Sequence, residues 1–216
     1  MTDHAALMDR VYRHQRYIYD FTRKYYLFGR DRLIADLAPK PGARIIEIGC
    51  GTSRNLIKIA RAYPTARLFG LDASAEMLLT SRDSIEKAGL GSRIKLVQAY
   101  AEDLTPALFG EQEPFDVAVF SYSLSMIPDW KQALSAAQRS LAPGGKVHVV
   151  DFGDLKGLGP IAERLLRGWL ALFHVAPREE LIRTIEKRAS DGHGGSLKLL
   201  AGRYAFVWSG GDQGWP

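Results

Sequence analysis

The 216-residue sequence predicts an α/β fold with a doubly wound, largely parallel sheet. Short apolar runs alternate with helical segments, as parallel strands covered by helices on both faces require. The expected parallel strands are Arg44–Ile48, Arg67–Leu71, Arg93–Val97, Phe115–Phe120 and Lys146–Asp151. Two further runs near the end predict an antiparallel hairpin on the sheet edge, and hence seven strands in all, at Leu197–Ala201 and Tyr204–Trp208.

The helical segments carry recognisable end signals. Ser74 is a suitable N-cap and Gly89 a suitable C-cap for a helix over Ala75–Ala88. The turn Leu141-Ala142-Pro143-Gly144-Gly145 is expected to end another helix and to start the fifth strand. These signals support the alternation of strands and helices.

We expect one domain over residues 1–216, because a chain of this length with 46% hydrophobic residues can bury a single full core. Its expected parts are a helical cap arm (1–38), a cofactor-binding core (39–154), a helical insertion (155–195) and the terminal hairpin (196–210). No run of about 18 apolar residues occurs, and Met1–Arg10 is mixed and charged, which predicts a soluble, cytosolic protein.

Composition excludes some functions. Cys50 is the single cysteine, so it forms no disulfide within the chain, and its place in a glycine turn favours a packing role over a nucleophilic one. The net charge is +5, but the basic residues are spread along the chain. Without zinc-ligand spacing or a helix-turn-helix signature, we expect neither a metal nor a nucleic-acid partner.

A nucleotide-cofactor site is predicted where the first strand enters a glycine turn. Glu47 is followed by Gly49-Cys50-Gly51-Thr52, and Asp72 closes the second strand 21 residues after Gly51. In a Rossmann-like βαβ unit such an acid lies at the ribose of a bound adenosine.

The same turn argues against NAD. Arg54 stands where a dehydrogenase fingerprint has its third glycine. Glu47 would repel a pyrophosphate, whereas it can bind an ammonium or organise the loop around a zwitterionic amino acid.

Five motifs together give the chain a resemblance to the class I S-adenosylmethionine-dependent methyltransferases: Glu47–Thr52, Asp72, Tyr100–Asp103, Phe115–Val117 and Leu141–Gly145. The resemblance implies that S-adenosylmethionine is the cofactor and S-adenosylhomocysteine the product, without a metal. It places Gly49 and Gly51 under the methionine moiety and Asp72 on both ribose hydroxyls.

The cofactor-binding residues that the resemblance implies are Tyr19, Tyr25, Arg30, Glu47, Gly49, Gly51, Thr52, Asn55, Asp72, Ala73, Met77, Tyr100, Ala101, Glu102 and Ser121. Many relatives have an aspartate before alanine at the adenine pocket, but here Tyr100 precedes Ala101. We therefore expect the Ala101 backbone to contact adenine and leave open whether Tyr100 or Glu102 meets its amine.

The N-terminal arm is unusually aromatic, with seven aromatic residues in seventeen between Tyr12 and Phe28. Its pattern at Tyr19–Ile34 resembles the betaine-lipid methyltransferases, which trimethylate the amine of diacylglyceryl-homoserine. By that resemblance Tyr19, Tyr25 and Arg30 contact the methionine end of the cofactor, with Arg30 at its carboxylate. The segment Ser121–Trp130 is also similar to phospholipid and quinone methyltransferases, so phosphatidylethanolamine or a small-molecule or quinone acceptor is the alternative.

An amine acceptor needs no strong base, because an α-amine with a pKa of about 8 has a neutral fraction near pH 7. Our candidates for catalysis are Tyr122 and Tyr25, as hydrogen-bond or cation-π groups at the acceptor amine. Asp151 is a third candidate, either as an ammonium partner or as a cap of the following loop.

The insertion contains an amphipathic helix over Pro160–Val175 with Trp169 and Phe173 on its apolar side. It can dock on a bilayer interface or cover its own domain. With the lipid resemblance, we expect a cytoplasmic enzyme that contacts the inner face of the membrane transiently through a lipid headgroup amine. A binding module that only retains the fold is the remaining alternative, and the intact cofactor motifs argue against it.

Overall fold

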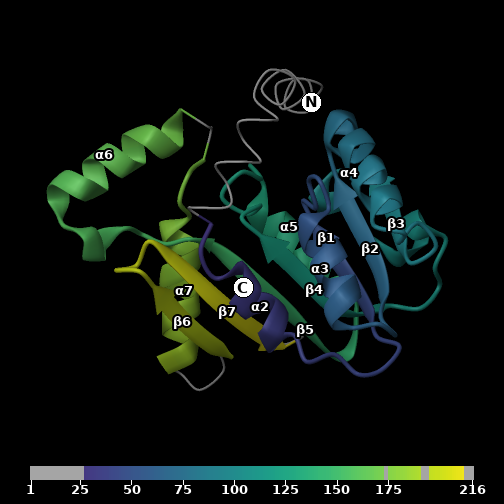
Figure 1. The fold of residues 1–216 in the computed structure, drawn as a ribbon. Helices are drawn as coiled ribbons and strands as arrows, with labels where there is room; N and C mark the ends of the chain where they lie inside the picture. Colours follow the sequence, from purple (N-terminus) through teal and green to yellow (C-terminus); the bar gives the residue numbers. More distant parts are fainter. Residues whose placement is uncertain (1–26, 173–174, 191–194, 212–216) are drawn as a thin grey trace.

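The computed structural model describes residues 27–172, 175–190 and 195–211 (Figure 1). Its strands are β1 (Arg44–Ile48), β2 (Arg67–Asp72), β3 (Ile94–Gln98), β4 (Phe115–Ser121), β5 (Leu141–Phe152), β6 (Ser196–Leu200) and β7 (Ala205–Gly211). They form one sheet in the order β3-β2-β1-β4-β5-β7-β6, parallel from β1 to β5 and antiparallel at β7 and β6. The predicted seven-stranded α/β fold is confirmed.

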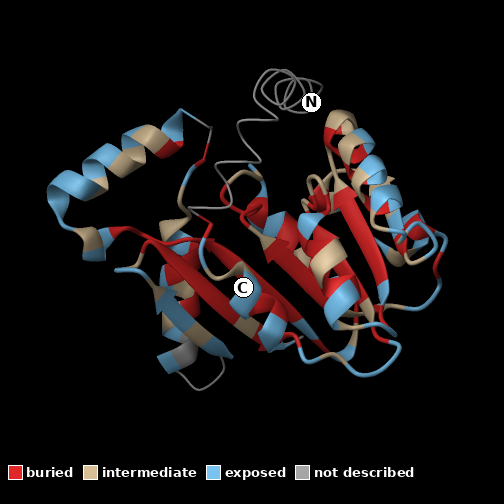
Figure 2. Cartoon of the chain, in the orientation of Figure 1, coloured by how far each residue is buried: buried red, intermediate tan, exposed pale blue. Residues whose placement is uncertain are grey.

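The helices are α2 (Arg30–Asp36), α3 (Arg54–Ala62), α4 (Ala75–Lys87), α5 (Trp130–Arg139), α6 (Pro160–Ala171) and α7 (Glu179–Ser190). Buried side chains of α2, α3 and α4 belong to one apolar cluster, and those of α5 and α7 to a second. The strands between them are mostly buried (Figure 2). The sheet is thus covered on both faces, which explains its continuous apolar runs.

The α4 helix begins as its sequence predicts. Ser74 Oγ accepts a hydrogen bond from the Met77 amide at 3.2 Å. At the other end the helix stops at Lys87, and Gly89 follows the cap residue Ala88 with a φ of +69°. A left-handed conformation at this position favours glycine.

The fifth strand starts earlier than predicted. Leu141 already pairs with Phe115, and the register then shifts before Val117 pairs with Lys146. The Pro143-Gly144-Gly145 segment is therefore an irregularity inside β5 rather than a turn in front of it. Gly144 has a φ of +77°, which suits a bulge of this kind.

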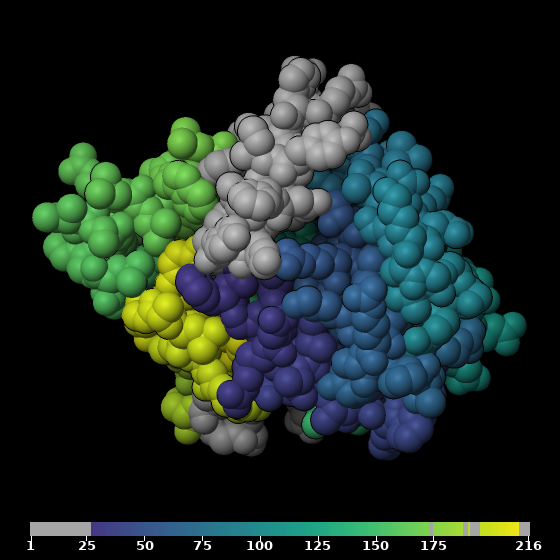
Figure 3. All heavy atoms as spheres, viewed as in Figure 1, coloured from purple at the N-terminus to yellow at the C-terminus, as the bar shows by residue number. Residues whose placement is uncertain are grey.

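The insertion between β5 and β6 contains two helices. α7 packs on the sheet through Leu181, Ile182 and Ile185, whereas α6 extends away from the sheet (Figure 1). On the face of the sheet opposite α7, α2 lies between the terminal hairpin and α3 (Figure 3), and Lys198 of β6 contacts Asp36 at 3.5 Å.

Glu111 joins the amino ends of three strands. Its carboxylate accepts hydrogen bonds from Arg44 at 2.9 Å, Arg67 at 3.0 Å and Lys95 at 2.6 Å. These donors come from β1, β2 and β3. The Lys95 bond and the positive charges of Arg67 and Arg44 hold the pKa of Glu111 below its usual range.

We predict that Glu111→Gln lowers the melting temperature at neutral pH and reduces the loss of stability in acid. A carboxyl group whose folded pKa is depressed stabilises above its unfolded pKa and loses that contribution as the pH falls. Calorimetry between pH 3 and 7 measures this, with the exposed Glu113→Gln as control. Equal melting curves for both variants would contradict the prediction.

Candidate functional site

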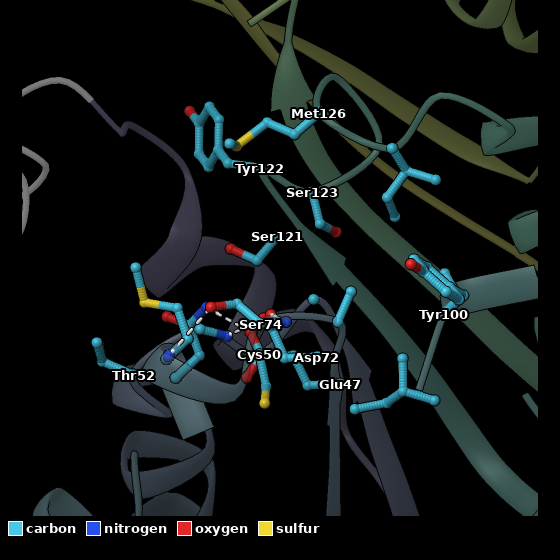
Figure 4. A pocket seen from close by; sticks show the side chains of 18 of the residues that line it. Glu47, Cys50, Thr52, Asp72, Ser74, Tyr100, Ser121, Tyr122, Ser123 and Met126 are labelled. Carbon is cyan, nitrogen blue, oxygen red and sulfur yellow. Dashed lines mark hydrogen bonds between the residues drawn. The ribbon is translucent and has the colours of Figure 1, made fainter. Parts of the chain in front are cut away.

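A cavity of about 310 Å³ opens at the carboxyl ends of β1, β2 and β4 (Figure 4). The chain reverses its direction of strand addition here, since β2 and β4 flank β1, and such switch points are where α/β folds bind ligands. Most of the predicted cofactor-binding residues line it: Arg30, Glu47, Gly49, Gly51, Thr52, Asn55, Asp72, Ala73, Met77, Tyr100, Ala101, Glu102 and Ser121. Tyr19 and Tyr25 lie outside the described residues.

The glycine turn after β1 is fixed by the end of β2. The amides of Gly49 and Cys50 both donate to the Leu71 carbonyl, at 2.8 and 3.0 Å. Gly49 has a φ of +74°, and a Cβ there would lie 2.6 Å from Ser123 Cβ. Gly51 has a φ of +52° with nothing within 4 Å of its ideal Cβ position. The turn is thus closely packed at Gly49 and open at Gly51.

Asp72 links the two loops that form the cavity floor. Its Oδ2 accepts from the Gly51 amide at 2.7 Å, and its Oδ1 accepts from the Ser74 amide at 2.9 Å. Since an ionised carboxylate has about four acceptor positions, the half-buried Asp72 can also accept hydrogen bonds from a ligand. A pair of vicinal hydroxyl groups fits this chemistry.

Glu47 is buried in the wall of the cavity. Its Oε1 accepts from Asn55 Nδ2 at 2.7 Å, while its Oε2 has no hydrogen-bond partner within the described part of the chain. Burial raises the pKa of Glu47 to about 7, against the Asn55 hydrogen bond and the charge of Arg30, which both lower it. The pKa of this carboxyl group is therefore raised toward neutral pH.

We predict that Glu47→Gln flattens the pH dependence of stability between about pH 4.5 and 7. In the free protein the folded state binds the Glu47 proton more tightly than the unfolded state, so stability falls as the pH rises through this window. The total loss is of the order of 3 kcal/mol. Denaturant titrations at several pH values measure it, and a slope unchanged from wild type would contradict the prediction. Exposed Glu113→Gln is the control.

The segment after β3 forms the opposite end of the cavity. Tyr100 precedes a short 3-10 turn over Ala101–Asp103. Ala101 is buried, and the side chains of Tyr100 and Glu102 are partly exposed at the cavity. Either of these two side chains can therefore face the amine of a bound adenine.

The loop after β4 forms the remaining wall. Tyr122 has a φ of +55°, and its hydroxyl donates to the Phe28 carbonyl at 2.6 Å. Burial raises the pKa of Tyr122 well above its usual value, so the phenol is a neutral hydrogen-bonding group and not a base. Ser123 Oγ donates to the Ile48 carbonyl at 2.8 Å, which ties this wall to β1.

Asp151 does not reach the cavity as an ammonium partner would have to. It is buried, its Oδ2 accepts from the Ser125 amide at 3.0 Å, and its Oδ1 accepts from the Phe152 amide at 2.8 Å. The post-β4 loop covers this end of β5. Asp151 thus holds the preceding post-β4 loop and not the loop that follows β5, so its observed contacts match neither of the two roles considered for it.

Several cavity residues were not predicted as site residues: Leu27, Cys50, Arg54, Leu71, Ser74, Ser123, Met126, Ile127, Pro128 and Asp129. Met126, Ile127 and Pro128 make the post-β4 wall apolar. The only sequence signal for them was the Ser121–Trp130 similarity. Burial raises the pKa of the Cys50 thiol well above its usual value, which agrees with a packing role.

Within the described residues no cluster of three or more His, Cys, Asp or Glu side chains is arranged to hold a metal. No described helix is both long and apolar enough to span a bilayer.

Sequence comparison relates the chain to methyltransferases. Residues 45–145 match the model of a family described as "Methyltransferase domain". The ubiquinone/menaquinone biosynthesis C-methyltransferase UbiE of Brucella anthropi is 31% identical over 152 residues, which cover 69% of this chain and 55% of that protein. The trans-aconitate 2-methyltransferase of Streptomyces avermitilis is 36% identical over 122 residues, covering 54% of this chain and 44% of that protein. The chain thus spans about half the length of these relatives.

Solved structures agree on the fold. The S-adenosylmethionine-dependent methyltransferase SibL in its apo form has a TM-score of 0.64 at 22% identity, covering 90% of this chain and 56% of its own. A chain from the complex between the Haloferax volcanii Trm112 methyltransferase activator and the putative methyltransferase has a TM-score of 0.67 at 14% identity, covering 89% and 92%.

Proposed function

We propose that this chain is a class I S-adenosylmethionine-dependent methyltransferase, which transfers a methyl group from that cofactor to an acceptor bound against the post-β4 loop. The match of residues 45–145 to a methyltransferase-domain family and the similarity to named methyltransferases support this proposal. The observation that carries the proposal is the position of Asp72, which faces the cavity at the switch point while it holds the Gly51 amide. This arrangement suits a ribose beside a glycine turn.

The lining residues fit the cofactor part by part. Asp72 offers oxygens to the ribose hydroxyls, and the open space at Gly51 admits the amino-acid portion. Arg30 lines the cavity and offers a cation to its carboxylate. The bound cofactor supplies an electrophilic methyl group on a sulfonium, and the residues of the chain orient the acceptor toward it.

The comparisons favour a small-molecule acceptor of the quinone type, the alternative from the sequence, because UbiE of Brucella anthropi is named a ubiquinone/menaquinone C-methyltransferase. Met126, Ile127 and Pro128 give the post-β4 wall an apolar surface, against which a flat ring can lie. We therefore propose this acceptor class first.

A lipid amine is the second candidate, and the N-terminal pattern at Tyr19–Ile34 favours it. Successive methylation of diacylglyceryl-homoserine to its trimethylated form requires a site for a neutral amine that becomes a cation. Tyr122 beside the cavity supplies an aromatic ring, and Asp129 supplies a carboxylate at its rim. Tyr25 keeps its proposed role at the amine, and phosphatidylethanolamine is a related acceptor.

We also propose transient contact with the cytoplasmic face of a membrane. Ile161, Leu165 and Leu172 are 78%, 71% and 73% exposed. Their spacing puts them on one face of α6 and its end. With a net charge of +5, the protein would be attracted to anionic lipid at about 1 kcal/mol per basic residue at the surface. Salt-sensitive co-sedimentation with anionic vesicles tests this, with Ile161→Ser/Leu165→Ser as the variant.

The acceptor is tested by incubating the purified chain with S-adenosylmethionine and four acceptors in parallel. These are a demethylated quinol, trans-aconitate, diacylglyceryl-homoserine vesicles and phosphatidylethanolamine vesicles, all analysed by mass spectrometry. A single methyl gain on the quinol supports the first candidate, and one to three gains on the homoserine lipid support the second. If the cofactor binds but no acceptor gains mass, both acceptor assignments fail.

A further inference from the structure

We propose that Arg178 is a positioning residue for the acceptor: from outside the cavity it fixes the shape of the post-β4 wall, residues 122–129. The inference rests on the proposed function, because it takes this wall as the acceptor side. Arg178 does not line the cavity and is half-buried just before α7, some fifty residues along the chain from the wall.

One guanidinium holds two carbonyls of the wall. Arg178 Nε donates to the Leu124 carbonyl at 3.1 Å, and its Nη2 donates to the Ile127 carbonyl at 2.6 Å. The planar fork of arginine fixes the two carbonyls relative to each other. The side chains of Met126, Ile127 and Pro128, which face the cavity, lie within or next to this clamped stretch.

Backbone bonds inside the wall and at its start add to the clamp by Arg178. Within the wall the amides of Met126 and Ile127 both donate to the Ser123 carbonyl, at 3.0 and 2.9 Å. The wall also begins with Tyr122 at a positive φ, a conformation that costs a non-glycine residue about 1 kcal/mol or more and persists only where the surroundings impose it.

The start of the wall is held by the bonds of Tyr122 to Phe28 and of Ser123 to Ile48, and its middle is held at Ser125 from two sides. Asp151 binds the Ser125 amide from β5, and the Ala176 amide donates to the Ser125 carbonyl at 3.0 Å from the segment that leads into α7. Arg178 extends this second set of contacts to the end of the loop. The segment Leu124–Ile127 of the wall is therefore held between β5 and the insertion, and Arg178 is the side chain through which the insertion bonds to both ends of this segment.

The contacts that hold the acceptor side of the cavity differ from those that hold the cofactor side. Asp72 ends β2, and the Gly49–Gly51 turn bonds to Leu71 and Asp72 of that strand; none of these bonds involves Arg178. Loss of the guanidinium is therefore expected to disturb acceptor recognition while cofactor binding remains.

The test compares Arg178→Met, Arg178→Lys and the control Arg183→Met, whose side chain on α7 is 70% exposed. We expect Arg178→Met to lower kcat/KM for the acceptor by about tenfold to a hundredfold, mainly through KM, since hydrogen bonds to a charged donor are lost. The Kd of S-adenosylhomocysteine should stay within about twofold of wild type. Arg178→Lys should lie between, because one ammonium matches the two carbonyls less well.

Two results would overturn the proposal. One is an acceptor KM of Arg178→Met that equals the KM of Arg183→Met. The other is a loss of cofactor affinity in Arg178→Met as large as its loss of kcat/KM for the acceptor, which would indicate a general structural role. If wild type methylates no acceptor, the proposed function fails by itself. In that case amide hydrogen exchange tests the positioning role of Arg178, because it requires no activity measurement. Faster exchange of the Ser125–Ile127 amides in Arg178→Met, with the Gly49–Gly51 amides unchanged, supports it, and exchange equal to that of Arg183→Met overturns it.

Discussion

Replacing Asp72 with alanine is expected to lower the affinity for S-adenosylmethionine by at least about a hundredfold. If Asp72 binds both ribose hydroxyls as proposed, each hydrogen bond would contribute about 1.5 to 3 kcal/mol, so the loss of two would exceed a factor of one hundred. The substitution also releases the amides of Gly51 and Ser74, which Asp72 binds at 2.7 and 2.9 Å. The glycine turn then loses its tie to the end of β2.

Isothermal titration with the cofactor and with S-adenosylhomocysteine measures this effect. Asp83→Ala, in an exposed position of α4, is the matched control and should bind like wild type. Asp72→Asn is expected to bind nearly as weakly as the alanine variant, because its amide group presents a donor to one of the two backbone donors. Binding within about threefold of wild type by Asp72→Ala would exclude the ribose assignment.

The core of the fold was predictable because its signals are local. The strand β1 has the predicted bounds Arg44–Ile48, and every residue after Arg44 in it is buried. A continuous apolar run of this kind is what a central parallel strand requires. The start of β5 was not predictable, since proline and two glycines usually indicate a turn, and only the pairing of Leu141 with Phe115 makes this segment part of the sheet.

The position of the glycine turn and of Asp72 at the cavity was predictable for the same reason. Glycines at positive φ and an acid at a strand end are imposed by backbone geometry, so they leave a pattern in the sequence. The post-β4 wall carries no such pattern. Met126, Ile127 and Pro128 have the composition of ordinary packing residues, and only the tertiary structure turns them toward the cavity.

Asp151 is the reverse case, a residue that was expected near the ligand but does not line the cavity. A carboxylate near the carboxyl end of a parallel strand is normally close to the ligand, which made it a candidate ammonium partner. Here β5 continues to Phe152, where it pairs with Ala205 of β7, and the post-β4 loop covers Asp151. The hydrogen bond to Ser125 involves a partner 26 residues earlier. Pairings at this separation are set by packing and leave no local signal.

Gly49→Ala is expected mainly to lose stability and Gly51→Ala mainly to lose affinity for the cofactor, although the two glycines are only two residues apart. At Gly49 a Cβ would lie 2.6 Å from Ser123 Cβ, so the wall or the turn must move. Overpacking of this kind costs about 1 to 3 kcal/mol. The left-handed backbone adds about 1 to 2 kcal/mol for alanine. The melting temperature should therefore fall by roughly 5 to 15 °C in a domain of this size.

At Gly51 the added methyl group meets no atom within 4 Å and enters open space at the cavity. Gly51→Ala should therefore lose less stability, about 1 to 2 kcal/mol from its φ of +52°, but bind S-adenosylmethionine at least about tenfold more weakly. Calorimetry and cofactor titration on both variants separate the two effects.

Ser123→Gly removes the atom that a Cβ at Gly49 would strike, so it isolates the clash from the backbone strain. In the double variant Gly49→Ala/Ser123→Gly we expect a smaller loss of stability than the sum of the single losses, a coupling of about 1 kcal/mol or more. The backbone cost at Gly49 remains, as does the loss of the bond from Ser123 Oγ to the Ile48 carbonyl. Two results would contradict this prediction: stability losses of the single variants that add up in the double variant, or equal melting temperatures for Gly49→Ala and Gly51→Ala. Either result would mean that the close approach of the glycine turn to the post-β4 wall does not determine the stability of the site.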